Sequence, residues 1–211
     1  MKIIPACLVA LALAACAARQ VEPSWRPNAT SALDSFSDAF LKGDSAIAAV
    51  DFARARREMS GTGRADLVAH AELVRCAVKT ASLDGGQCEG FAPLAQDAGA
   101  APRAYAAYLA GQWQGLDAAL LPPQHRAIAS GAGGLVGMVE PLSRLVAAGA
   151  MLQAGRIAPA DIVIATDTAS AQGWRRPLLA WLGVAAQRAR AVGDTAQLAR
   201  IERRIALAAS R

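Results

Sequence analysis

Two cysteines twelve positions apart, Cys76 and Cys88, are the residues whose types and spacing most clearly indicate chemistry. The dipeptide Gly85-Gly86 lies between them and would let the chain turn back. In an oxidising compartment we expect a disulfide that closes a loop at the end of a helix. Two buried free thiols, or redox or metal chemistry, are the alternatives. A zinc site would need more ligands at close spacing, and the sequence holds no Cys-x-x-Cys motif.

Residues that could support catalysis are few. The only histidines are His70 and His125. His70 follows Asp66 by four positions, so a local ion pair or hydrogen bond on one helix is expected. No Gly-x-Ser-x-Gly, His-Glu-x-x-His or Gly-x-x-x-x-Gly-Lys-Ser/Thr motif occurs. Glu140, just before Pro141, could be the general acid of a cell-wall-cleaving enzyme, but a carboxylate at a helix start is the simpler interpretation. We therefore predict no catalysis, no cofactor and no metal.

One candidate for partner binding is aromatic. Tyr105 and Tyr108 are three positions apart, so they share a helix face, and Trp113 follows closely. Such a group more often belongs to the core. It would serve as a binding platform only if the side chains were exposed.

The second candidate is basic. Residues 173–211 carry eight arginines and two acidic residues, in a chain whose net charge is +5. Arg200, Arg204 and Arg211 are expected on the solvent side of the last helix. They would attract anionic lipid, phosphate groups or an acidic protein surface, or would simply face solvent.

An apolar leader precedes all of these residues. Lys2 is followed by about a dozen apolar residues, which is the layout of a secretory signal and too short to span a bilayer. Leu13-Ala14-Ala15-Cys16 resembles the bacterial lipobox. The resemblance implies cleavage before Cys16, acylation of its sulfur, and stable membrane anchoring by several acyl chains. An ordinary signal cut at Ala12-Leu13-Ala14 is the alternative. Ala17 rather than Asp follows the lipid site, which implies the outer membrane and a domain that faces the periplasm. Nucleic acid is not an expected partner there, despite a pI near 9.4.

The elements that position these residues are expected to be helical. Alanine supplies 53 of the 211 residues and only 10 are aromatic, which favours helices over an aromatic-rich β-sandwich. A charged fraction of 18% and a hydrophobic fraction of 54% exclude a disordered tail. The 3.6-residue periodicity predicts helices at 31–42, 45–59, 64–82, 91–98, from Pro102 onward, and at 141–154, 159–172, 177–192 and 194–209.

The helix at 64–82 carries apolar stripes on two opposite sides, so we expect it to lie between neighbours on both sides. Glu72 falls in the charged wedge between the stripes, together with Arg64, Arg75 and Lys79.

Four segments are expected along the chain: a signal peptide at 1–15, a lipidated tether at 16–30, and two helical halves at 31–130 and 135–211. The glycine-rich stretch around 131–134 reads as the joint between the halves rather than as an anion-binding loop. Gly43, Ala48, Phe52 and Ala55 resemble the middle of a tetratricopeptide repeat, although that family's upstream Trp and closing Pro are absent. The resemblance implies stacked helical hairpins.

The sequence thus predicts an all-α protein of stacked antiparallel helical hairpins, either a divergent α-solenoid or a compact helical bundle. We expect a lipid-anchored binding or assembly module for an envelope protein complex, because hairpin stacks offer large surfaces. A cell-wall-active enzyme or its activator, and a carrier of a small apolar ligand, are the alternatives.

Overall fold

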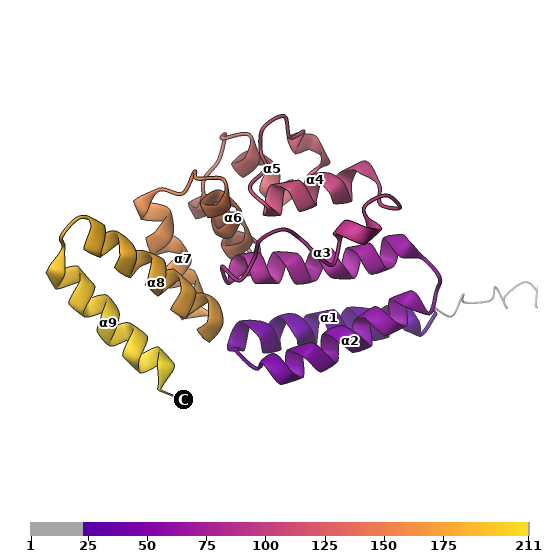
Figure 1. Ribbon diagram of the computed structural model, residues 1–211, viewed down its shortest axis with the longest axis horizontal. Helices are drawn as coiled ribbons and strands as arrows, with labels where there is room; N and C mark the ends of the chain where they lie inside the picture. Colours follow the sequence, from indigo (N-terminus) through magenta and orange to yellow (C-terminus); the bar gives the residue numbers. More distant parts are fainter. Residues whose placement is uncertain (1–22, 211) are drawn as a thin grey trace, which may run out of the picture.

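The computed structural model describes residues 23–210, and within this range the chain forms nine α-helices, three short 3-10 turns and no strand (Figure 1). The all-α prediction is confirmed. The predicted signal peptide, the predicted lipid site Cys16 and Arg211 lie outside the described residues. The α-helices are α1 (Trp25–Lys42), α2 (Ser45–Ser60), α3 (Ala65–Ala81), α4 (Ala100–Leu109), α5 (Pro123–Ala129), α6 (Pro141–Gln153), α7 (Pro159–Ala171), α8 (Arg175–Ala191) and α9 (Thr195–Ala209).

Most predicted helix bounds agree with the structure to within two residues, and two do not. The first helix is longer than predicted, because α1 begins at Trp25 and not at residue 31. Ala29 and Trp25 pack against the core cluster of the first hairpin, and this burial extends the helix through Pro27. The helix expected at 91–98 is only the 3-10 turn η1 (Ala92–Leu94), with turns on either side of it.

Helices α1 and α2 form a tightly packed antiparallel hairpin. Gly43 ends α1 in the left-handed conformation, with φ of 99°, and its N–H bonds to carbonyls of the last turn. Ala48, Phe52 and Ala55 line the buried side of α2. The four residues that resemble a tetratricopeptide repeat therefore form the turn and the inner face of a helical hairpin.

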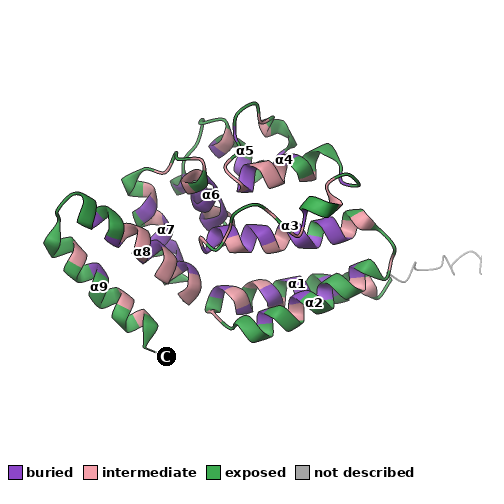
Figure 2. Ribbon diagram, viewed as in Figure 1, coloured by how far each residue is buried: buried purple, intermediate pink, exposed green. Residues whose placement is uncertain are grey.

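Helix α3 is the centre of the fold, as its two apolar stripes predict (Figure 2). One side packs on α1 and α2 through Val68, Ala71 and Val78, and the other side packs on α4 and α6. The crossing with α6 is close: a Cβ on Gly149 would overlap the carbonyl oxygen of Thr80. A glycine is therefore required where these two helices meet.

The last four helices form successive neighbours, with α7 between α6 and α8, and α9 packed on α8 alone among its close partners. Pro141 and Pro159 occupy first helical turns, as their positions predict. The seam between α8 and α9 contains Leu182, Ala186 and Ile201. The largest apolar cluster runs from Cys76 in α3 to Trp181 in α8 and so draws on residues from both sides of the glycine-rich stretch at 131–134.

Two adjacent arginines at the start of α8 connect the first and last hairpins. Arg175 donates to the carbonyl oxygens of Ala208 and Ala209, which end α9, at 2.8 and 3.1 Å. Arg176 reaches the turn between α1 and α2. The stack of helices is thereby closed into a compact curve rather than left open (Figure 1).

Candidate functional site

The predicted disulfide between Cys76 and Cys88 is present, with the two Cα atoms 5.4 Å apart. Cys76 lies in the second half of α3, and Cys88 belongs to the irregular segment that follows α3. The bridge therefore holds this segment, residues 82–91, against the helix.

The aromatic candidates for partner binding belong to the core. The Tyr108 ring stacks on Trp113 at 5.1 Å and on Tyr105 at 6.2 Å between ring centroids. Tyr108 and Trp113 are buried, and the Trp113 indole N–H donates to the Tyr108 carbonyl oxygen at 2.8 Å. Tyr108 and Trp113 therefore do not meet the condition of exposure that a binding platform requires, while Tyr105 is partly buried.

His125 of α5 completes the aromatic cluster. Its Nδ1 lies 3.3 Å from the Tyr108 hydroxyl, and both side chains are buried. Burial lowers the pKa of His125 to about 4, because the imidazolium would lose its hydration; Glu140 opposes this shift only in part. The imidazole is therefore neutral at pH 7 and acts as a hydrogen-bonding member of the core.

Glu140 is the N-cap of α6. One carboxylate oxygen accepts from the N–H of Leu142 at 2.8 Å and the other from the N–H of Ser143 at 2.5 Å. The structure confirms the simpler interpretation of this residue, since both oxygens satisfy N–H groups that a helix start leaves without partners.

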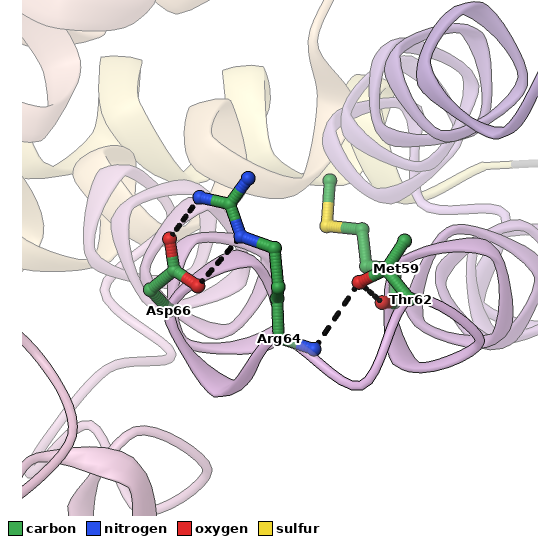
Figure 3. A network of polar contacts seen from close by, with 4 residues as sticks. All are labelled: Met59, Thr62, Arg64 and Asp66. Carbon is green, nitrogen blue, oxygen red and sulfur yellow. Dashed lines mark hydrogen bonds and ion pairs between the residues drawn. The ribbon is translucent and has the colours of Figure 1, made fainter. Parts of the chain in front are cut away.

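The expected pairing of Asp66 with His70 is not formed. Asp66 instead accepts two hydrogen bonds from the Arg64 guanidinium, at 2.6 and 3.2 Å (Figure 3). These bonds lower the pKa of Asp66. The Arg64 backbone N–H donates to the Thr62 hydroxyl, which itself donates to the Met59 carbonyl oxygen at 2.6 Å. Arg64 is two positions from Asp66 and His70 is four, and it is Arg64 that binds the Asp66 carboxylate. Its bonds to Asp66 and Thr62 hold the backbone where α3 begins.

The basic residues of the last two helices divide into two groups. Arg175 and Arg176 make internal contacts with helix ends. Arg190 pairs with Glu202 at 2.9 Å, and Arg204 lies 4.0 Å from Asp167 of α7. Arg204, a predicted partner-binding residue, thus faces a neighbouring helix rather than solvent alone.

The outer face of α9 consists of Ala196, Arg200, Arg203 and Leu207, which are all exposed. Their spacing places them on one side of the helix, opposite Ile201 and Ile205. Leu207 is 77% exposed, and neither arginine has an ion-pair partner among residues 23–210. Arg203 was not among the arginines that the sequence predicted on the solvent side, which were Arg200, Arg204 and Arg211.

Sequence reasoning also missed a second site, at Glu72. Only 4% of this residue is exposed, although it lies with Arg75 and Lys79 in the charged wedge between the apolar stripes. Glu72 accepts from Arg56 of α2 at 3.2 Å and pairs with Arg75 at 2.5 Å. The Arg75 guanidinium also lies 4.5 Å from the centre of the Phe52 ring. Segment 82–91 covers the carboxylate, and nothing in the local sequence pattern indicated that it would fold back.

No helix within 23–210 has the length and apolarity to cross a bilayer. The same part of the chain contains no group of three or more His, Cys, Asp or Glu side chains arranged to hold a metal ion.

Comparisons with protein-family models, curated proteins and solved structures find no match to this chain.

Proposed function

We propose that this protein is a lipid-anchored, periplasm-facing helical module that binds an acidic protein partner of the cell envelope through the outer face of α9. The anchor rests on the lipobox-like Leu13-Ala14-Ala15-Cys16. The binding role rests on one observation: α9 exposes Leu207 beside two arginines, Arg200 and Arg203, that have no ion-pair partner among residues 23–210.

The physical argument is that a terminal helix needs a polar outer face to remain monomeric. The outer face of α9 has two exposed guanidinium groups, but it also exposes the apolar side chain of Leu207. An apolar anchor flanked by arginine is typical of binding hot spots, and guanidinium groups pair well with partner carboxylates. An acidic surface with an apolar depression would therefore complement this helix.

The position of α9 supports the same assignment. The described chain starts at the end of α1 that lies on the far side of the molecule from α9 (Figure 1). A chain anchored through residues 16–22 would therefore present α9 away from its attachment point. A partner would be met in the periplasmic space rather than in the anchoring leaflet.

Anchoring is tested by intact mass measurement of the mature full-length protein from its native host. We expect the loss of the first fifteen residues and the added mass of acyl chains on Cys16. A mature chain that retains these residues and carries no lipid would overturn the anchor.

Binding is tested by replacing Leu207 with a photo-crosslinking amino acid in cells. We expect a crosslinked acidic protein that disappears when Arg200→Glu and Arg203→Glu are added. The matched control, Arg54→Glu with Arg57→Glu on α2, makes the same change in net charge on another exposed helix face. A crosslink that survives the α9 substitutions, or is lost equally in the control, would contradict the proposal.

A further inference from the structure

A hollow of about 410 Å³ lies between α3 and segment 82–91, independent of the α9 face. Glu72, Arg75 and Lys79 line its helix side, and Asp84 and Glu89 line its loop side. The volume falls in the range of about 300–1,000 Å³ that is usual for small-molecule sites. We call it the loop hollow.

The loop wall of the hollow is fixed at three points. A Cβ on Gly85 would lie 3.0 Å from the Thr80 hydroxyl oxygen, so this part of the segment lies against the end of α3. The Cys76–Cys88 disulfide holds the middle. A Cβ on Gly90 would overlap the Glu72 carboxylate, so the segment packs directly on that ion pair. A wall held in this way loses little conformational entropy when a ligand binds.

The two sides of the loop hollow differ in charge: α3 forms the helix wall, which offers cationic groups, and segment 82–91 forms the loop wall, which offers carboxylates. On the helix wall, Glu72 is neutralised by Arg56 and Arg75, while the remaining N–H groups of Arg75 are available as donors. Lys79 follows Arg75 by one helical turn and has no ion-pair partner among the described residues. On the loop wall, Asp84 and Glu89 are exposed carboxylates without a cationic partner within 23–210.

We infer that the loop hollow binds a small zwitterionic molecule, an amino acid or short peptide. Its carboxylate would pair with Arg75 and Lys79, and its ammonium group would pair with Asp84 and Glu89. A simple anion would satisfy only the helix wall and would leave both loop carboxylates without partners. A zwitterion satisfies both walls with charge-assisted hydrogen bonds, which are about twice as strong as neutral ones.

The inference is tested by isothermal titration of the full-length protein in detergent with three probes. Alanyl-alanine carries both charges, N-acetyl-alanyl-alanine only the carboxylate, and alanyl-alanine amide only the ammonium group. We expect the unblocked dipeptide to bind at least tenfold more tightly than either blocked form. Equal binding of a blocked form, or no binding of any probe, would overturn the inference.

Two substitutions locate the binding. Lys79→Gln and Asp84→Asn should each weaken dipeptide binding about tenfold or more. The matched controls are Lys42→Gln and Asp38→Asn, which break an exposed ion pair of 2.8 Å on α1. Unchanged affinity in Lys79→Gln and Asp84→Asn, or equal losses in the controls, would show that the peptide does not bind in the loop hollow. Thermal melts confirm that each variant is folded. Neither result depends on the partner of α9.

Discussion

The Arg176 guanidinium bonds to the Phe40 carbonyl oxygen at 2.7 Å and lies 4.2 Å from the centre of the Phe40 ring. These residues are 136 positions apart, in α8 and α1. The same side chain donates to the Ser45 hydroxyl at 2.5 Å, at the start of α2. A single arginine thus adds a second hydrogen bond to a carbonyl in the last turn of α1, which already accepts from the Gly43 N–H, and stacks on the aromatic ring of the same residue.

Replacement of Arg176 should destabilise the protein as a whole. Arg176→Ala removes charge-assisted hydrogen bonds and a cation–π contact, so we expect a loss of about 2 kcal/mol. In a domain of this size, that corresponds to a fall in Tm of about 4–8 °C. Arg176→Lys should be intermediate, because an ammonium group cannot reproduce the planar fork. Calorimetry checks this, with exposed Arg188→Ala as the control that should change Tm little. Equal melting of the two alanine variants would contradict the role of Arg176.

Two helical glycines should respond in opposite directions to alanine. Gly149→Ala would force a methyl group into the Thr80 backbone, so we expect a loss of about 1–3 kcal/mol. Gly183 of α8 has nothing within 4 Å of an added Cβ. Gly183→Ala should therefore gain about 0.5–1 kcal/mol from helix propensity. Urea denaturation measures the free energy of unfolding of the two variants. A Gly149→Ala protein as stable as the natural chain would contradict the prediction and would show that α3 and α6 can move apart.

The stability of the protein should fall in mild acid because of His125. Its pKa is about 4 in the folded protein and about 6.5 when unfolded, so the unfolded chain binds the proton more readily. Stability contributed by the neutral imidazole is complete above pH 6.5 and is lost progressively as the pH falls to 4. The total loss is on the order of 3 kcal/mol.

The measurement for His125 is urea denaturation between pH 4 and pH 7. His125→Gln should flatten the pH dependence relative to the natural chain, although it lowers stability throughout. His70→Gln is the control, because His70 is exposed and should leave the pH dependence intact. The same slope in all three proteins would mean that other groups cause the acid sensitivity.

Reduction of the Cys76–Cys88 disulfide should destabilise the chain by about 3 kcal/mol, as expected for a short closed loop. Segment 82–91 would also be released from α3, so proteolysis should cut the reduced protein near Gly85 and Gly86. Limited proteolysis with and without a dithiol reductant measures this. Cleavage at the same rate in both states would mean that the two glycine contacts hold the segment without the bridge.

Periodicity predicts most of the helices, because their apolar residues recur at the helical period, and most of them also end near a glycine or begin near a proline. Helix α3 is the clearest case, since its two apolar stripes predict neighbours on both sides. The sequence could not reveal that Glu72 is buried, because the residues that cover it come from an irregular segment. Likewise, Arg176 and Phe40 are too far apart in the chain for any local pattern to connect them.

The adjacent residues Arg175 and Arg176 have a mechanical consequence. Arg175 donates a hydrogen bond to the last turn of α9, and Arg176 donates one to the end of α1, at the turn of the first hairpin. A pull on α9 would therefore reach α1 and α2 across one peptide bond, bypassing the five helices from α3 to α7. Under a pulling force, α9 and the first hairpin should therefore move together and should not separate from each other.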